Sequence, residues 1–80
     1  MVRFVYYMAE WCRPCKMYWP KVLAWATEWD VALTKVDLSD GLVDGIQSVP
    51  TMDVIVDGKL RLRVTQWGPG TRKQILGVLS

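Results

Sequence analysis

The stretch Trp11-Cys12-Arg13-Pro14-Cys15-Lys16 (WCRPCK) lies where an apolar run ends and a helical pattern begins, and it holds both cysteines of the 80-residue chain. The segment before it, Val2 to Met8 (VRFVYYM), is rich in β-branched and aromatic residues and predicts a strand buried on both faces. Pro14 falls at an early helical position, where a missing N–H costs nothing. We therefore expect a helix to begin at about Cys12.

The remainder of the chain predicts a small α/β domain. Apolar residues recur every three or four positions to about Trp29, which predicts an amphipathic helix. Strands are expected over 31–36, 52–56 and 60–65, with Asp57-Gly58 as a hairpin turn, a short polar helix or turn through Asp44, and a last helix over 71–79. The expected fold is a single domain over 1–80 with element order β-α-β-α-β-β-α. Its four-stranded mixed sheet is flanked by helices.

Composition excludes several classes of function. Ten Lys and Arg against eight Asp and Glu give a net charge of +2, and the mixed signs indicate neither a nucleic-acid nor a membrane surface. The chain has no His, the commonest metal ligand and general base. The apolar run over 4–9 is too short for a signal-peptide core or a membrane span. We expect a soluble, cytoplasmic monomer without a metal site.

The position of the two cysteines predicts redox chemistry. A thiol reacts as its thiolate, and the N-terminus of a helix stabilises that anion at Cys12, with Arg13 acting in the same direction. Cys15, one turn along, comes within reach of the Cys12 sulfur. Two alternatives stay open on spacing alone. The pair could be half of a zinc site, which needs four ligands, or a structural disulfide, although so short a loop contributes little stability.

Two further patterns concern packing. Trp19, Trp25 and Trp29 recur at helical spacing, which favours core packing over binding. By contrast, Trp11 and Trp67 flank cysteine and glycine turns, which favours exposed positions. The cations Lys59, Arg61 and Arg63 alternate along one predicted strand, so we expect them to share a solvated face.

Several segments together resemble the thioredoxin family. Residues 9–17, with Pro20 beyond them, resemble its active-site segment, except for Arg13 where that family usually has Gly. Lys35 resembles the family's buried strand lysine, and Val49-Pro50-Thr51 resembles the loop whose cis proline faces the disulfide. Asp57-Gly58-Lys59 and Gly68 resemble its hairpin and the glycine of its substrate groove. The chain is identified as a minimal, glutaredoxin-sized member of the thioredoxin/glutaredoxin superfamily, without the N-terminal strand and helix of full-length thioredoxins.

This resemblance implies a thiol–disulfide oxidoreductase that reduces protein disulfides, with Cys12 as nucleophile and Cys15 as resolving thiol. No bound cofactor is implied. Electrons would come from a flavin-dependent, NADPH-using thioredoxin reductase or from glutathione, and ribonucleotide reductase is one candidate substrate. The implied substrate groove consists of Trp11, Val49, Pro50, Trp67 and Gly68. The alternative function is a non-catalytic module that binds a partner through Trp11, Pro50 and Trp67.

The residues expected to modulate the pair are Arg13, Pro14, Lys35 and Tyr6. Tyr6 and Lys35 lie nearest in the predicted sheet to act as a base for Cys15. Tyr6 stands where thioredoxins usually bury an Asp, and a phenol with a pKa near 10 cannot replace a carboxylate as base at pH 7. Water or Lys35 would then act as the base for Cys15, or the attack of Cys15 on the mixed disulfide would be slower. Because Arg13 favours the thiolate, we expect a reduction potential above the roughly −270 mV of thioredoxin, toward about −230 to −200 mV.

Overall fold

The computed structural model describes residues 1–43 and 45–80. Its elements are β1 (Val2–Met8), α1 (Arg13–Glu28), β2 (Ala32–Asp37), β3 (Thr51–Val56), β4 (Lys59–Val64) and α2 (Thr71–Leu79). The predicted strands and the two long helices therefore form, with boundaries within one residue of expectation. No helix in the described ranges is long and apolar enough to cross a membrane.

The four strands form one mixed sheet in the order β2-β1-β3-β4. β1 pairs parallel with β2 and antiparallel with β3, and β3 pairs antiparallel with β4. Asp57 and Gly58 join β3 to β4 with φ of 52° and 82°, the two positive values that a type I′ hairpin turn requires. Because β1 is a central strand, its C-terminal end and the cysteine turn after it lie in the middle of one end of the sheet.

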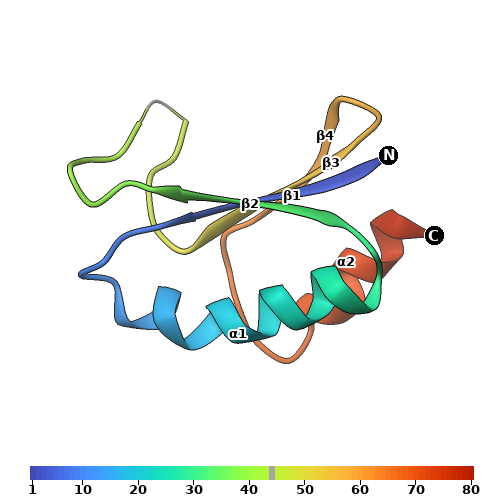
Figure 1. Ribbon diagram of the computed structural model, residues 1–80, viewed down its shortest axis with the longest axis horizontal. Helices are drawn as coiled ribbons and strands as arrows, with labels where there is room; N and C mark the ends of the chain where they lie inside the picture. The colour runs from blue at the N-terminus through green and yellow to red at the C-terminus, as the bar shows by residue number, and fades with distance from the viewer. Residues whose placement is uncertain (44) are drawn as a thin grey trace.

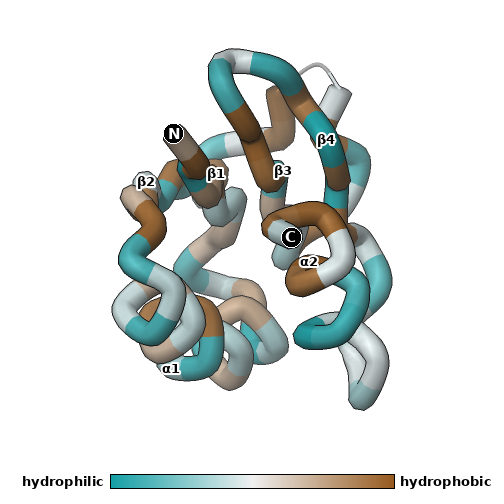
Figure 2. The backbone as a smooth tube through the Cα atoms, turned by 90° about the vertical axis from the view of Figure 1, so that its right-hand side faces the viewer, coloured by the Kyte–Doolittle hydropathy of each residue, from teal (hydrophilic) through white to brown (hydrophobic). Residues whose placement is uncertain are grey.

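Both helices lie on the same face of the sheet, and the core fills the space between (Figure 1). Figure 2 shows the hydrophobic segments gathered along the strands, with alternating character along α1. Trp19, Trp25 and Trp29 pack half-buried against this core, which confirms their predicted packing role. The fully buried side chains at its centre come from β1, α1, β3 and α2: Phe4, Tyr6, Val22, Met52, Val54 and Ile75.

Two expectations about the elements need correction. Of the short polar helix or turn expected between β2 and β3, the described part of this loop contains turns and no helix; the expected segment includes Asp44, which lies outside the described residues. Gly41 and Gly45 have φ of 146° and 88°, values incompatible with a helix. The fully buried side chains of β1, Phe4 and Tyr6, also lie on its helix side only, because no helix in the described residues covers the other face, where Val5 and Tyr7 are half-buried and Arg3 is exposed.

The predicted common face of Lys59, Arg61 and Arg63 is interrupted. The pairing of β3 with β4 shifts by one residue between Val54 and Ile55, so that Leu60 opposes Ile55 and Leu62 opposes Val54. A one-residue bulge exchanges the two faces of a strand. Arg63 consequently lies beside Asp53, on the face of the sheet opposite to that of Lys59.

Candidate redox site

Cys12 occupies the N-cap position of α1. Its backbone is extended, with φ of −93° and ψ of 105°, and its sulfur accepts a hydrogen bond from the Cys15 N–H at 3.2 Å. The Cys12 N–H donates to the Ala9 carbonyl at 3.1 Å, which closes the turn between β1 and the helix. Pro14 stands in the first helical turn, as the sequence predicts. The helix N-terminus therefore directs an N–H group at the sulfur of Cys12.

The two cysteines form a disulfide with a Cα–Cα distance of 5.3 Å. Cys12 retains 5% of its surface exposed, whereas Cys15 is fully buried. Both pack with Ala9 in a small apolar cluster that Met8 and Val49 cover in part. Because only Cys12 reaches the surface, the two sulfurs differ in access. In the described residues, no group of three or more His, Cys, Asp and Glu side chains is arranged to hold a metal ion.

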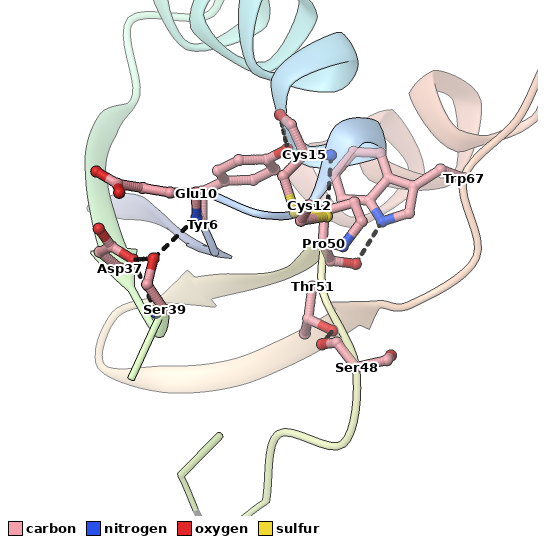
Figure 3. Close-up of a disulfide and its surroundings, with 10 residues drawn as sticks. All are labelled: Tyr6, Glu10, Cys12, Cys15, Asp37, Ser39, Ser48, Pro50, Thr51 and Trp67. Atoms are coloured by element: carbon pink, nitrogen blue, oxygen red, sulfur yellow. Dashed lines mark hydrogen bonds between the residues drawn. A yellow bond between two sulfur atoms is a disulfide. The ribbon is translucent and has the colours of Figure 1, made fainter. Parts of the chain in front are cut away.

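The loop before β3 brings Val49 and Pro50 beside the disulfide. The Val49–Pro50 peptide bond is cis, Pro50 is buried, and Val49 packs on the cysteine cluster (Figure 3). Thr51 is anchored through its hydroxyl, which donates to the Ser48 carbonyl at 2.8 Å. Among the hydrogen bonds between described residues, none engages the backbone of Val49. Its N–H and C=O are therefore available to a partner.

Trp11 and Trp67 differ in exposure, and Figure 3 shows Trp67 beside Pro50. Trp11 is 64% exposed, as expected, and its Nε1–H donates to the Ser39 carbonyl at 3.2 Å. The expectation for Trp67 is wrong: it is half-buried, with ring centroids 5.9 Å from Tyr6 and 5.0 Å from Tyr18. Its Nε1–H donates to the Pro50 carbonyl at 2.8 Å, so it fastens the proline loop from within.

Gly68 follows Trp67 at the entry to α2. It is exposed, and its N–H donates to the Thr71 hydroxyl at 2.9 Å. Of the five predicted groove residues, Val49 and Pro50 thus lie beside the disulfide. Trp11 is exposed and precedes Cys12 in the chain. Trp67 contacts the Pro50 carbonyl, and Gly68 follows it.

Tyr6 lies beneath the cysteine turn and is fully buried. Its hydroxyl donates to the Cys15 carbonyl at 2.7 Å, and its ring packs against Trp19 with centroids 5.4 Å apart. Burial raises the pKa of Tyr6 to about 12. This geometry makes Tyr6 a donor that supports the Cys15 backbone, and it is protonated throughout the physiological range.

Lys35 is exposed rather than buried as expected, because β2 is the edge strand of the sheet. Its Nζ lies 4.7 Å from the centre of the Trp19 ring, a cation–π distance. Even so, Lys35 reaches the site, because it lines a cavity of about 270 Å³ together with Cys15, Tyr6, Met8, Lys16 and Trp19.

Arg13 and Pro14 are exposed on the first turn of α1. With Lys16 and Met17 they line a surface hollow of about 550 Å³. Arg13 immediately follows Cys12 in sequence, so its positive charge adds to the field of the helix N-terminus.

Sequence reasoning missed Ser39, which secures the cysteine turn. Its hydroxyl accepts the Glu10 N–H at 2.8 Å, and its N–H donates to Asp37 at 2.9 Å (Figure 3). Hydrogen bonds from the Ser39 hydroxyl and N–H hold the pKa of Asp37 below its usual range. No spacing in the sequence links Asp37 or Ser39 to Glu10.

Sequence reasoning also missed a polar network on the uncovered face of the sheet. Asp53 is buried, and Arg63 holds its carboxylate through two hydrogen bonds of 2.7 and 2.9 Å. Arg63 also donates to the Gly45 carbonyl at 3.0 Å, and the Tyr7 hydroxyl donates to Asp53 at 3.3 Å. The network ties the loop before Val49 to β3 and β4. A lone carboxylate inside the apolar run TMDVIV was its only signal in the sequence.

A mixed sheet that carries a C-x-x-C disulfide at a helix N-terminus, facing a cis proline, defines the class of thioredoxin-like proteins. The thioredoxin family model matches residues 2–79, and the chain belongs to the thioredoxin family. A thioredoxin fold with two cysteines at disulfide distance supports a thiol–disulfide oxidoreductase in general terms. No curated protein matches the sequence.

Solved thioredoxins share this fold. A thioredoxin from Plasmodium falciparum is 24% identical with a TM-score of 0.81, over 99% of this chain and 82% of that one. A mutant thioredoxin from Halobacterium salinarum is 28% identical with a TM-score of 0.78, over 94% and 70% of the two chains. Thioredoxin 1 from Thermosipho africanus is 15% identical with a TM-score of 0.77, over 96% and 89%. The chain thus spans 70% to 89% of the length of these three structures.

Proposed function

We propose that the protein is a protein disulfide reductase in which Cys12 is the nucleophile and Cys15 the resolving thiol. One observation carries this proposal: Cys12 is the N-cap of α1 and accepts the Cys15 N–H at 3.2 Å, while Cys15 is fully buried. In the reduced protein the same N–H and the helix N-terminus stabilise a Cys12 thiolate. A substrate therefore meets the more reactive sulfur first.

The cycle has two exchange steps. The Cys12 thiolate attacks one sulfur of a substrate disulfide; a mixed disulfide forms, and the other substrate sulfur leaves as a thiolate that takes a proton from water. Cys15 then loses its proton and attacks the Cys12 sulfur. The Cys12–Cys15 disulfide forms, and the second substrate sulfur leaves as a thiolate. In total, two electrons pass from the cysteine pair to the substrate.

Lys35 is the group that assists the second step in this proposal. Tyr6 cannot accept the Cys15 proton, because its hydroxyl is already donating to the Cys15 carbonyl and its pKa lies at about 12. The cavity behind Cys15 is large enough for water, and Lys35 borders it. A nearby ammonium favours the Cys15 thiolate, and water carries the proton away.

The substrate is expected to bind as an extended segment beside the proline loop. The backbone N–H and C=O of Val49 pair with it as in strand addition, and the exposed Trp11 covers it from the other side. Gly68, beyond Pro50, leaves room for its backbone. Trp67 contributes indirectly, since it holds the Pro50 carbonyl.

The partners proposed are those that a reductant of protein disulfides needs. Electrons come from an NADPH-dependent thioredoxin reductase or from glutathione, and ribonucleotide reductase is one candidate among the substrates. We place this activity in cell redox homeostasis in the cytoplasm, with the protein acting as a monomer. The resemblance of the cysteine segment to thioredoxins supports these proposals.

The first test is the reduction potential of the pair, measured by tryptophan fluorescence in glutathione buffers. A value between about −270 and −200 mV is expected for a cytoplasmic reductant. The order of the steps is tested by trapping: Cys15→Ser should accumulate a mixed disulfide with a peptide substrate, and Cys12→Ser should not. If no reversible transition is found, or if the double Cys→Ser variant keeps the cellular function, the fold serves instead as an interaction module.

A further inference from the structure

Charged side chains of both signs lie near Cys12. Arg13 and Lys16, here called the cationic edge, are exposed in the first turn of α1, and that turn contains no acidic residue. Glu10, which precedes Cys12 in the chain, and Asp37 lie beside Ser39 (Figure 3). The cysteine that retains exposed surface is therefore followed in the chain by two cations and preceded by a carboxylate.

The cationic edge is free to meet a partner. The ion pairs found among the described residues join Arg63 to Asp53, Arg72 to Glu28 and the N-terminus to Asp57. Neither Arg13 nor Lys16 takes part in one. These two charges are therefore not neutralised within the described chain, in contrast to Arg63 and Arg72.

The same edge borders an apolar hollow. Pro14 and Met17 form its apolar walls, and Met17 is 60% exposed. A methionine on a surface adapts its shape to an apolar side chain of a partner. The hollow has room for an apolar side chain, while Arg13 and Lys16, which also line it, attract a carboxylate.

We propose that this edge selects the disulfide partner of the enzyme: a protein segment that carries a carboxylate and an apolar side chain next to its reactive cysteine. The inference rests on the proposed function, because selection acts through the rate of disulfide reduction. Complementary charge accelerates the encounter and fixes the direction of the bound segment across Cys12. A segment with a basic residue at that place is disfavoured by Arg13 and Lys16.

Two synthetic peptides test the selection. They have equal length, one intramolecular disulfide and a leucine beside the reactive cysteine, and they differ only in a neighbouring Glu or Lys. Prereduced protein is mixed with each peptide in a single turnover. In about 10 mM salt, where the Debye length is about 30 Å, we expect the acidic peptide to react about tenfold faster. In about 1 M salt the ratio should approach one, because charges are screened beyond about 3 Å.

Matched variants locate the effect. Arg13→Gln/Lys16→Gln should abolish the preference, while Lys59→Gln/Arg61→Gln, which removes two exposed charges from β4, should keep it. Arg13 also affects the reactivity of Cys12 toward every substrate, so the readout is the ratio of the two rates, in which that reactivity cancels. Met17→Ser should slow both peptides to a similar degree and leave the ratio unchanged.

The outcomes are distinguishable. If both peptides react at equal rates in low salt, the charge selection is overturned and the reductase function stands. Loss of the preference in both double variants would assign it to net charge and overturn the role of this edge. Should neither peptide be reduced, the proposed function itself fails.

Discussion

Tyr6 shows how a single residue can occupy a catalytic position without taking a catalytic role. Tyr6 lies beneath Cys15, at the position where thioredoxins usually have a buried Asp. Its hydroxyl donates to the Cys15 backbone carbonyl and stays protonated. Its phenol ring packs on Trp19 and Trp67. In the proposed cycle, support of the Cys15 backbone and handling of its proton thus fall to different residues, Tyr6 and Lys35.

Replacing Tyr6 tests this separation through stability. Tyr6→Phe keeps the ring but leaves the buried Cys15 carbonyl without its donor, which should cost about 1 to 2 kcal/mol at pH 7. Burial raises the pKa of Tyr6 from 10.0 to about 12, so the unfolded chain loses this proton at lower pH than the native protein. The stability that Tyr6 contributes is therefore complete below pH 10 and is lost as the pH rises through about 12.

Urea unfolding at pH 7, 10 and about 12 measures both effects. The native protein should lose about 2 to 3 kcal/mol more than Tyr6→Phe across the alkaline range. The difference in stability between the two proteins therefore shrinks as the pH rises and reverses in sign by the end of the alkaline range, because the expected loss exceeds the difference at pH 7. A gap that stays constant up to pH 12 would mean that Tyr6 titrates normally in the fold.

Lys35 is the residue at which the second exchange step can be altered without touching the cysteines. Lys35→Met removes the ammonium beside the Cys15 cavity and should slow resolution of the mixed disulfide about three- to tenfold at pH 7, with the pH profile displaced upward. Lys35→Arg should restore most of the rate, because the charge is kept. Stopped-flow decay of the mixed disulfide against pH is the measurement.

Lys21→Met is the matched control for Lys35. Lys21 also lies over an aromatic ring, 5.7 Å from the centre of Tyr18, but it does not border the Cys15 cavity. The Lys21→Met variant should resolve the mixed disulfide at the same rate as the native protein. Equal slowing in both lysine variants would assign the effect to net charge rather than to the position of Lys35.

At the scale of elements, the sequence predicted regular structure better than irregular structure. The periodicity of α1, the apolar strands and the Asp57-Gly58 turn are local signals, and each element formed where expected. For the loop between β2 and β3 the sequence predicts a short polar helix or turn, and its described residues contain turns but no helix. Glycines at 41 and 45 took positive φ, and the Asp37 and Ser39 side chains fasten the cysteine turn.

The network of Asp53 and Arg63 is the element-scale feature that positions the proline loop. Arg63→Met would leave the buried Asp53 carboxylate without its partner, at a cost of about 2 to 4 kcal/mol. It would also release the Gly45 carbonyl, so peptide reduction should slow because the Val49–Pro50 segment is held less firmly. Urea unfolding and the single-turnover assay measure the two consequences.

A double variant separates charge burial from packing in this network. Asp53→Leu/Arg63→Met removes both charges together, and its stability should recover most of the loss seen in Arg63→Met alone. If the double variant is as unstable as the single one, the network acts through shape rather than through charge.

At the scale of the whole molecule, one face of the sheet carries both helices and the other relies on a loop (Figure 1). The cysteine pair, its place at a helix N-terminus and the facing proline were predictable, because sequence neighbours or a family resemblance carry them. Three features were not predictable, since each depends on which segments meet in space: the placement of both helices on one face, the exposed Lys35 and the half-buried Trp67. Single-sequence periodicity contains no information about such contacts.

The loop on the second face should therefore contribute to the stability of the entire domain. Ile46, in that loop, is 4% exposed, while Leu42 in the same loop is 44% exposed. Ile46→Ala should lower the free energy of unfolding by about 2 to 4 kcal/mol, a large part of the total for a domain of this size. Leu42→Ala, its control, should cost less than about 0.5 kcal/mol. Urea unfolding measures both free energies. If both variants lose similarly little stability, the sheet and its helix layer are stable without a contribution from the loop.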